Sequence, residues 1–304
     1  MVVRKAGAAL AAGCAMVIKP SPEAPLSALA LAFLAEEAGI PKGVLNVLTT
    51  SLENTPGLSE ALCRHPLVKK VTFTGSTRIG KLVARLCSEG LKKVTLELGG
   101  NCPFIIFDDA NLNEAANVYE EFASLITERT SRLVQGHGSL ATSTIGPVTT
   151  PQALERTKQL VEDAKAQGAK ILLGGGQLKD TSGFFFQPTV IAEATKSMRF
   201  ADEECFAPIL SLFKFETEAQ VIQAANDTSV GLASYVFTKD MDRSWRLMDA
   251  LEAGMIGVNT NSIAGAEVPF GGIKESGYGK EAGKDVAVDE YLVTKAISVS
   301  VSHL

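Results

Sequence analysis

The sequence of 304 residues is poor in the side chains that build metal and disulfide sites. Its three histidines are scattered, and its five cysteines are odd in number and show no Cys-x-x-Cys spacing. We therefore predict no metal site, no disulfide framework and no histidine-based catalytic triad. The cysteines are expected to be reduced thiols in a reducing compartment such as the cytoplasm. They are Cys14, Cys63, Cys87, Cys102 and Cys205.

The chain also lacks an excess of positive charge and a long apolar run. A net charge of −5, with acidic and basic residues interspersed, argues against a nucleic-acid-binding or anionic membrane surface. No apolar run approaches the roughly 20 residues that a membrane-spanning helix needs. Hydrophobic residues make up 46% of the sequence, which is enough for a packed core, so we expect a globular protein suited to small-molecule chemistry.

The first twenty residues allow two interpretations. Arg4, Lys5, several alanines and the absence of acidic residues resemble a targeting segment, which would leave a mitochondrial location open. Alternatively, residues 6–12 form a helix that leads directly into an apolar strand at 15–19. The second interpretation is favoured, because the helical pattern runs into that strand without a break.

The first hundred residues alternate short β-rich runs with segments of helical spacing. Strand, helix, strand with short links indicates parallel strands joined by right-handed crossovers. The sequence therefore predicts a partial doubly wound, Rossmann-like α/β domain over residues 1–100. Its predicted strands are 15–19, 44–48, 70–75 and 93–98, and its predicted helices are 27–39, 56–65 and 77–90.

A second α/β domain is predicted over residues 101–288, followed by a tail at 289–304. Its clearest helix, 153–168, ends at a glycine. Between residues 112 and 146 the pattern offers one helix and a polar loop, with no strand where the α/β alternation would place one. The tail alternates like an edge strand, and an exposed edge of this kind invites pairing with another subunit.

Two motifs at strand ends of the first domain are candidates for chemistry. Glu97 stands between a β-rich run and a Gly-Gly turn, so it is either a general base or a carboxylate solvated at the turn. The segment FTGSTRIGK at 73–81 is a strand, a turn and a helix start. Its backbone N–H groups could bind a phosphate, with Ser76 or Thr77 capping the helix, or the capped helix binds nothing.

Three further side chains and one loop carry weaker signals. Lys19 follows an apolar strand and either meets a ribose or phosphate or extends into water. Glu204 and Phe206 lie on one side of an extended segment, where they could hold a ribose hydroxyl and a flat heterocycle or simply pack a loop. The glycine-rich segment 269–283 is predicted to be an ordered loop of the kind that often has a function.

Taken in order, six segments resemble the aldehyde dehydrogenase superfamily. They are GAALAAGCAMVIKPS, FTGST, LELGGN, EECF, NDTSVGLASYVFT and PFGGIKESGYGKE. The opening and closing segments are most similar to the succinate-semialdehyde dehydrogenase branch. The resemblance covers almost the whole chain and implies the aldehyde dehydrogenase fold. It also implies NAD(P)+-dependent oxidation of an aldehyde, such as succinate semialdehyde, to a carboxylic acid.

The resemblance assigns roles to individual residues. Glu97 matches the general base of the family. The cofactor positions are Lys19 at the adenosine ribose, Gly75, Ser76, Thr77 and Gly80 at the pyrophosphate, and Glu204 and Phe206 at the nicotinamide ribose and ring. The implied cofactor is NAD or NADP. Many NAD-preferring members carry a glutamate three residues after the lysine, where this chain has Pro22, and an uncharged residue there admits NADP.

Two parts of the family pattern have no counterpart in the sequence. The N-terminal region, with the asparagine that stabilises the oxyanion, would precede Met1. The motif F-x-N-x-G-Q-x-C, which carries the nucleophilic cysteine, would lie where Asn117 joins Val118. We therefore predict an internal deletion near 117–118 and an inactive or impaired enzyme, unless the sequence reflects a gene model with a lost exon. Cys102 is not expected to replace the nucleophile, because nothing beside it lowers the pKa of its thiol.

The resemblance also has consequences for the fold and for partners. In the family the deleted piece is a helix segment and a strand, so neighbouring strands should lose backbone partners and apolar cover. The loop at 136–146 is expected to repack around this loss. The tail resembles the strand through which the family oligomerises, which predicts a homo-oligomer or pairing with an intact paralogue. A non-catalytic interaction partner is therefore the alternative to an aldehyde-oxidising enzyme.

Overall fold

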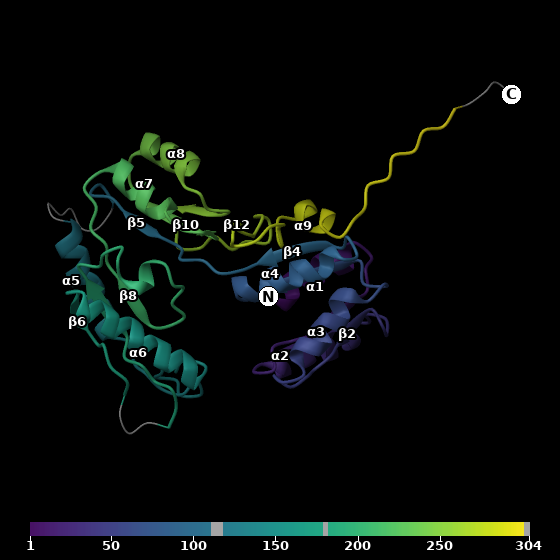
Figure 1. Ribbon diagram of the computed structural model, residues 1–304, viewed down its shortest axis with the longest axis horizontal. Coiled ribbons are helices and arrows are strands. Elements are labelled where there is room, and N and C mark those ends of the chain that lie inside the picture. Colours follow the sequence, from purple (N-terminus) through teal and green to yellow (C-terminus); the bar gives the residue numbers. More distant parts are fainter. Residues whose placement is uncertain (111–117, 179–181, 301–304) are drawn as a thin grey trace. The chain divides into compact units, whose positions relative to one another are not determined.

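The computed structural model describes residues 1–110, 118–178 and 182–300 (Figure 1). They form two compact units, Met1–Gly99 with Ser262–Leu304, and Gly100–Asn261. Residues 262–288, which the sequence prediction kept with the second region, therefore belong to the first unit.

Backbone hydrogen bonds to the first unit's strands explain this division. The N–H of Leu96 donates to the carbonyl of Tyr278 (2.8 Å), and the N–H of Leu98 donates to the carbonyl of Ser276 (2.9 Å). The glycine-rich loop thus runs along a strand of the first unit and is ordered by it. Local sequence pattern does not reveal such a pairing, since the two segments are far apart in the chain.

The first unit alternates helices and parallel strand pairs, as the sequence predicts. β1 pairs with β2 and β3 with β4, both in parallel, but as two separate pairs rather than one sheet. The first helix begins at Val2, earlier than expected. The elements are α1 (Val2–Ala11), β1 (Met16–Ile18), α2 (Pro25–Glu37), β2 (Leu45–Val47), α3 (Thr55–Arg64), β3 (Lys70–Thr74), α4 (Thr77–Ser88), β4 (Lys93–Glu97), β12 (Ile273–Lys274) and α9 (Asp285–Asp289).

The core of the first unit lies where α3 and α4 pack on β3 and β4. Its buried residues are Cys63, Val83, Leu86, Cys87, Leu96 and Leu98. Gly80 permits the close approach of α4, because a Cβ at this position would lie 2.3 Å from Cδ2 of Leu98. A larger residue there would require the Leu98 side chain or α4 to shift.

Helix α2 is apolar on nearly all sides and still exposed. It starts with a proline, which suits the first helical turn. Leu26 and Phe33 are 76% and 62% exposed, and Ala28 is the one buried residue of the helix. A helix of this composition is usually buried. The exposed face is therefore a surface that the first unit leaves without cover.

The second unit contains two three-stranded sheets. One has the order β11-β10-β5 with parallel pairs, and the other has the order β6-β7-β8, in which β6 is antiparallel to β7 and β8 is parallel to it. The elements are β5 (Phe104–Ile106), α5 (Val118–Ser131), α6 (Pro151–Ala166), β6 (Lys170–Leu173), β7 (Thr189–Ala192), the 3-10 helix η1 (Arg199–Ala201), β8 (Ile209–Ser211), α7 (Glu218–Asn226), β9 (Val230–Gly231), β10 (Ser234–Phe237), α8 (Met241–Ala250) and β11 (Ile256–Val258).

Each sheet of the second unit has its own hydrophobic core. Helices α7 and α8 lie on the same side of β10 and β5 (Figure 1), and a cluster around Val236 and Leu247 joins them. Helix α6 packs on β7 through Leu160 and Ile191. All of β7 is buried, so both faces of its sheet are covered. The α/β fold class predicted from the sequence is therefore confirmed.

Two segments with unusual patterns behave differently. After α5 the chain forms a loop with an isolated bridge between Gln135 and Ile145, so the polar loop expected there is present. Of the tail at 289–304, expected to form an edge strand, Asp289 ends α9 and residues 290–300 form no strand in the single chain, while 301–304 lie outside the described residues. No helix in the described ranges is long and apolar enough to cross a membrane.

Asp109 links the end of β5 to the start of α8. Its carboxylate accepts hydrogen bonds from the Thr238 hydroxyl (2.7 and 2.8 Å), from the backbone N–H of Lys239 and Asp240 (both 3.1 Å), and from Nη1 of Arg243 (3.0 Å). Four groups therefore depend on one side chain. Bonds of this kind to a charged acceptor are stronger than neutral ones.

We predict that Asp109→Ala lowers the free energy of unfolding by about 2–3 kcal/mol, because it leaves several donors without an acceptor. Asp108→Ala is the matched control, since its side chain is 84% exposed and lies 3.8 Å from the same arginine. Urea unfolding followed by circular dichroism measures both. Equal midpoints for the two variants would contradict the role of Asp109.

Candidate active site

Glu97 is the last residue of β4 and lies beside the Gly-Ser-Thr turn that ends β3. In the parallel pair it is opposite Thr74, and its carbonyl accepts from the N–H of Gly75 (3.1 Å). Its side chain points into the unit, and the residue is only 5% exposed. Of the two interpretations left open by the sequence, a carboxylate solvated at a turn is therefore wrong.

A second buried carboxylate, Glu281, neighbours Glu97. Burial, and then the negative charge of Glu281, raise the pKa of Glu97 from 4.5 to about 7. Oε1 of Glu97 and Oε2 of Glu281 have no hydrogen-bond partner among the described residues. Glu97 can therefore exchange a proton near neutral pH, as a general base must.

Helix α1 supplies the positive charges that face these acids. Lys5 forms an ion pair with Glu281 and donates to the Thr74 hydroxyl (2.8 Å). Nη1 of Arg4 lies 3.6 Å from Oε1 of Glu97, and its guanidinium stacks 3.7 Å from the ring centre of Phe270. Both charges lower the pKa of Glu97 and so limit the rise.

Sequence reasoning missed the roles of Lys5 and Glu281. Lys5 drew attention only as a feature of a targeting segment, and Glu281 only as part of the glycine-rich loop. The two residues are 276 positions apart, so no local pattern connects them. The available signal was weak: a lysine on an otherwise apolar helix face, and an acid in a loop already suspected of a function.

The turn at Gly75 is tightly packed. A Cβ at Gly75 would lie 2.5 Å from Cζ of Phe73, so a larger residue there would require this ring to move. Ser76 takes the N-cap position of α4, but its hydroxyl makes no capping bond, so that part of the prediction is wrong. Thr77 donates instead to the carbonyl of Glu275 (3.3 Å). The Ser76 hydroxyl and the first N–H groups of α4 are thus left for a ligand.

Lys19 sits just after β1, at its carboxyl end. Nζ donates to the carbonyl of Pro20 (2.8 Å), and partial burial lowers the pKa of the amine. The side chain is folded back on its own backbone rather than extended into water. It remains close to the strand end, where the resemblance implies a ribose.

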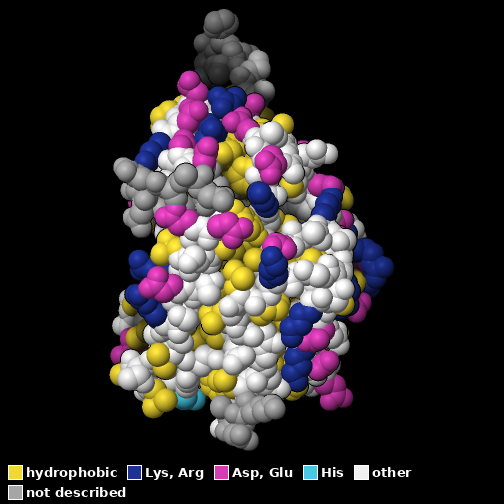
Figure 2. Space-filling model, turned by 90° about the vertical axis from the view of Figure 1, so that its left-hand side faces the viewer, with side chains coloured by type: hydrophobic (Ala, Val, Ile, Leu, Met, Phe, Trp, Pro, Cys, Tyr) yellow, Lys and Arg dark blue, Asp and Glu magenta, His cyan; other side chains and the backbone are white. Residues whose placement is uncertain are grey.

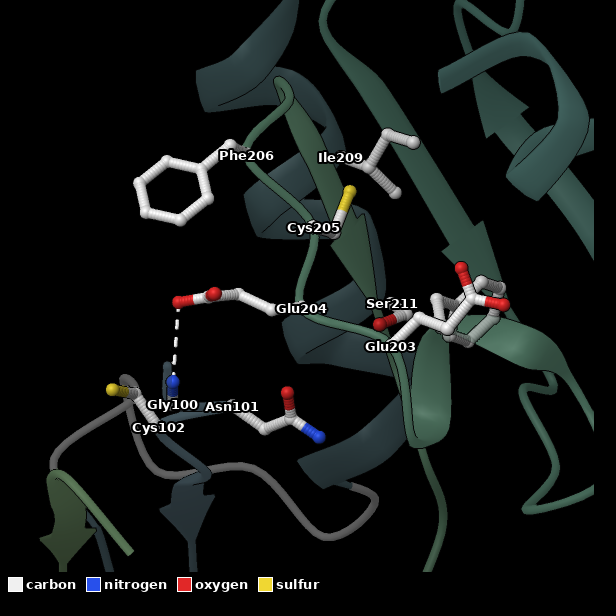
Figure 3. Close-up of a pocket in the computed structure, with 10 residues that line it drawn as sticks. Gly100, Asn101, Cys102, Glu203, Glu204, Cys205, Phe206, Ile209 and Ser211 are labelled. Carbon is white, nitrogen blue, oxygen red and sulfur yellow. Dashed lines mark hydrogen bonds between the residues drawn. The ribbon is translucent and has the colours of Figure 1, made fainter. Parts of the chain in front are cut away.

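Glu204 and Phe206 line a cavity of about 340 Å³ in the second unit (Figure 3). Glu204 reaches across it and accepts from the N–H of Gly100 (3.1 Å). The Phe206 ring is 84% exposed and therefore free to stack on a flat ligand. The alternative of a loop packed by its aromatic ring is wrong for this residue.

Four of the five cysteine thiols have a raised pKa, which makes them poor nucleophiles. Burial raises the pKa of Cys63, Cys102 and Cys205, and raises the pKa of Cys87 to about 12. In Figure 3 the sulfur atoms of Cys102 and Cys205 point in different directions. No cluster of three metal-binding side chains occurs in the described part of the chain.

The structure therefore groups the candidate residues in two sets. Lys19, the Gly75 turn and Glu97 belong to the first unit, and within it β3 and β4 bring the turn and Glu97 together. Glu204 and Phe206 belong to the second unit and share a cavity. The junction at 117–118 falls at the edge of residues 111–117, which lie outside the described residues.

Known proteins resemble the chain along nearly its whole length. The pattern of the aldehyde dehydrogenase family matches residues 1–118 and 115–297. A succinate-semialdehyde dehydrogenase [NADP(+)] of Schizosaccharomyces pombe is 44% identical over 325 residues, covering 99% of this chain and 65% of the relative. A glutarate-semialdehyde dehydrogenase of Pseudomonas putida is 43% identical over 99% of the chain and 66% of the relative.

Solved structures give the same result. A crystal structure of an Escherichia coli NADP-dependent enzyme has a TM-score of 0.91 at 41% identity, covering 95% of this chain and 64% of that one. Betaine aldehyde dehydrogenase of Staphylococcus aureus in complex with NAD+ has a TM-score of 0.89 at 33% identity, covering 97% and 64%. The chain thus spans about two thirds of the length of the relatives it matches. On its sequence and on its fold, it belongs to the aldehyde dehydrogenase family.

Proposed function

We propose that the chain is a member of the succinate- or glutarate-semialdehyde dehydrogenase type that is inactive or impaired in thiol-dependent oxidation. The names of the similar enzymes of S. pombe and P. putida support the substrate class. Such substrates are short aldehydes that carry a carboxylate. Under this proposal the chain has the general base and part of the cofactor site but lacks the nucleophilic cysteine.

An internal gap carries this proposal. The alignment with the S. pombe enzyme runs over 325 positions, more than the 304 residues of this chain, so the relative carries residues that have no counterpart here. The family pattern matches in two pieces that meet at residues 115–118. The cysteine motif expected from the resemblance would lie at this junction, where the sequence reads directly from Asn117 to Val118.

The cysteines that remain do not offer a replacement. A nucleophilic thiol needs a pKa lowered by a positive charge or a helix N-terminus. Cys102 instead has a raised pKa, with burial as the main cause and the carboxylate of Glu204 adding to it. It is also held at a φ of 47°, a left-handed conformation that favours glycine. The surroundings of Cys102 therefore bury its thiol and do not activate it.

Residues of each unit, taken separately, suit parts of a dinucleotide. The Ser76 hydroxyl and the N-terminus of α4 suit a pyrophosphate, and the free Phe206 ring suits a nicotinamide. One oxygen of Glu204 is bound to Gly100, which leaves the other for a ribose hydroxyl. When bound, NAD or NADP would accept a hydride. NADP is favoured because Pro22 carries no charge to oppose a ribose phosphate, and similar enzymes are named as NADP(+)-dependent.

A second candidate function is that of a binding partner for an intact family member. Residues 293–300 are extended, and Val293, Ile297 and Val299 are each at least 77% exposed. An exposed strand of alternating character can add to a sheet edge of another chain. Co-purification of a full-length aldehyde dehydrogenase with the tagged chain would support this function, and a monomer in cell extract would contradict it.

The activity prediction concerns reduced cofactor. Purified protein with NADP+ or NAD+ and succinate semialdehyde should produce no NAD(P)H above the protein-free rate, because the cysteine motif of the family has no counterpart in the sequence. The succinate-semialdehyde dehydrogenase [NADP(+)] of S. pombe serves as the active control. Production at an ordinary enzyme rate would overturn the proposal, and loss of that rate in Cys102→Ser would identify the recruited thiol.

Cofactor binding is predicted separately from catalysis. NADP+ should raise the melting temperature of the full chain, since a ligand at one hundredfold above its Kd stabilises the folded state by about 2.7 kcal/mol. Lys19→Met should reduce this shift by removing a positive charge at the site. Lys69→Met, an exposed lysine of the same unit, is the control and should leave the shift unchanged. No shift at millimolar cofactor would show that the site is not functional.

The raised pKa of Glu97 predicts a pH dependence of stability. Between pH 4.5 and about 7 the folded chain holds a proton that the unfolded chain has lost, so stability falls as the pH rises through this range. Glu97→Gln cannot ionise and should be more stable than the natural chain above pH 7, by up to about 3 kcal/mol. The free energies of unfolding of the variant and of the natural chain should become equal near pH 4.5.

Urea unfolding at several pH values measures this difference. Glu37→Gln, an exposed glutamate in α2, is the control and should follow the natural chain. If the stability of Glu97→Gln and of the natural chain showed the same pH dependence, this would contradict the raised pKa of Glu97.

A further inference from the structure

Part of the glycine-rich loop covers the edge of β4 that β3 leaves open. Below, the strap means residues 275–280, which lie beside β4 (Figure 1). The N–H of Leu98 donates to the carbonyl of Ser276 (2.9 Å), and the N–H of Leu96 donates to the carbonyl of Tyr278 (2.8 Å). The strap therefore takes the place of a third strand next to the parallel pair of β3 and β4.

Other backbone groups of β4 are bonded on the side of β3. The N–H of Lys93 donates to the carbonyl of Lys69 (3.2 Å), and the carbonyl of Glu97 accepts from the N–H of Gly75 (3.1 Å). Alternate residues of a strand direct their backbone groups to opposite sides, so the strap and β3 bond to different residues of β4. The strap can therefore leave β4 without breaking the pairing of β3 with β4.

Two glycines bring the strap very close to β4. A Cβ at Gly277 would lie 2.1 Å from the carbonyl oxygen of Leu96, and a Cβ at Gly279 would lie 2.7 Å from Oγ1 of Thr95. The φ angles of the two glycines, 108° and 82°, also favour a residue without a side chain. The closed position of the strap therefore depends on both glycines.

The strap begins and ends at residues suited to act as hinges. Lys274, just before it, has a φ of 52°, a left-handed conformation that is strained for a residue with a side chain. Gly279, close to its end, has no Cβ and can rotate with little steric hindrance. Beyond the strap, Glu281 is held by an ion pair with Lys5 and by a hydrogen bond from Thr72 (2.8 Å). The strap therefore lies between a strained residue and a fixed one.

The contacts at the start of the strap are exposed, and one contact further on is buried. The Thr77 hydroxyl donates to the carbonyl of Glu275 (3.3 Å), and Nζ of Lys81 lies 2.6 Å from Oε1 of Glu275. Both side chains of this ion pair are exposed, and such pairs contribute little to stability. The buried contact is the hydroxyl of Ser276, which donates to the carbonyl of Gly99 (2.5 Å). This bond and the two backbone bonds are therefore the main cost of opening the strap.

The strap also covers the face of β4 that carries Glu97. The side chains of Thr95 and Glu97 point to the same side, because residues two apart in a strand share a face, and Gly279 lies against Thr95. Burial lowers the pKa of Lys280, and the nearby charge of Glu97 opposes this change. The strap thus keeps water from one side of Glu97.

The charged groups that face Glu97 come from two elements. Helix α1 supplies Arg4 and Lys5, and the glycine-rich loop supplies Glu281 and Lys280. Burial raises the pKa of Glu97 more than any of these charges shifts it. Contact with water would therefore favour the ionised form of Glu97.

Charges on the outer surface are arranged differently. On the face shown in Figure 2, basic side chains in dark blue and acidic side chains in magenta lie interspersed. Water and salt screen exposed charges of this kind. Glu97 and Glu281 are each only 5% exposed, so their charges are screened much less. Admitting water to these two acids would therefore stabilise their negative charges.

We propose that the strap opens by rotation at Lys274 and Gly279 and thereby admits water to Glu97. Between pH 4.5 and about 7 opening releases a proton, because Glu97 holds this proton in the closed form and loses it once exposed. The open form therefore becomes up to about 300-fold more favourable as the pH rises through this range, and changes no further above it. The proposal goes beyond the proposed function, since the opening requires neither a nucleophile nor a cofactor.

Hydrogen exchange of single backbone amides, measured by NMR on the full chain, tests the opening. At pH 7 the amides of Leu96 and Leu98, which are bonded to the strap, should be protected at least about tenfold less than those of Lys93 and Gly75. Low urea should accelerate exchange only at Lys93 and Gly75, because a local opening exposes little surface. Equal protection and equal urea dependence at all four amides would show global unfolding alone and would overturn the proposal.

The pH dependence of this protection tests the link to Glu97. From pH 5 to pH 7 the protection of Leu96 and Leu98 should fall at least about tenfold in the natural chain. Glu97→Gln cannot ionise and should show no such fall, whereas the control Glu37→Gln should behave as the natural chain does. A fall of the same size in Glu97→Gln would overturn the proposed role of Glu97.

A glycine substitution tests whether closure depends on the close contact with β4. The methyl group of Gly277→Ala would meet the carbonyl of Leu96, so at pH 5 the amides of Leu96 and Leu98 should lose protection at least about tenfold. Gly57→Ala in α3, where a Cβ meets nothing within 4 Å, is the matched control and should keep the protection. Circular dichroism melts establish that both variants fold.

Ser276→Ala provides a second variant in case Gly277→Ala does not fold. It removes the buried hydroxyl bond of the strap and should accelerate exchange at Leu96 and Leu98 roughly fivefold. Unchanged protection of these two amides in a folded Gly277→Ala or Ser276→Ala chain would overturn the proposal.

Discussion

Two carboxylates, Glu97 and Glu281, are buried together in the first unit, and this is stable only because α1 places cations against them. Isolated charges of one sign cannot be removed from water without a large cost in free energy. Lys5 and Arg4 supply the compensation, and Thr72 adds a hydrogen bond to Glu281 (2.8 Å). The same contacts tie α1, β3, β4 and the glycine-rich loop into one body. Glu97, whose pKa burial raises to about 7, is thus one of the groups that hold the unit together.

Local sequence pattern predicted most elements of the fold but not their long-range partners. Runs of Val, Leu and Thr located β1, β3 and β4, since strand composition and length are local properties. The place of Ser276 and Tyr278 along β4 was not predictable, because it depends on backbone bonds between segments far apart in the chain. The partner of Glu97 was missed for the same reason. The resemblance to a known family found Glu97 itself, whereas composition alone left it ambiguous.

The surroundings of Glu97 are formed within the first unit, whereas the internal gap of the sequence lies in the second. A base requires burial and a neighbouring charge, and β4 with the glycine-rich loop supplies both locally. The relatives carry residues that have no counterpart in this sequence, and we propose that the nucleophile is among them. The strands beside this gap keep backbone partners, because β5 pairs with β10 and β8 pairs with β7. The second unit therefore has two three-stranded sheets, each with its own hydrophobic core.

The exposed apolar side chains of α2 favour self-association of the protein and binding by chaperones. Leu26, Leu29, Phe33 and Leu34 are all solvent-facing on a helix with one buried residue. Exposed apolar surface of this kind is what holdase chaperones capture and what drives self-association at high concentration. A partner that covers this face of α2 would therefore lower the tendency of the folded chain to self-associate, an effect separate from the stability of the α3–α4 core.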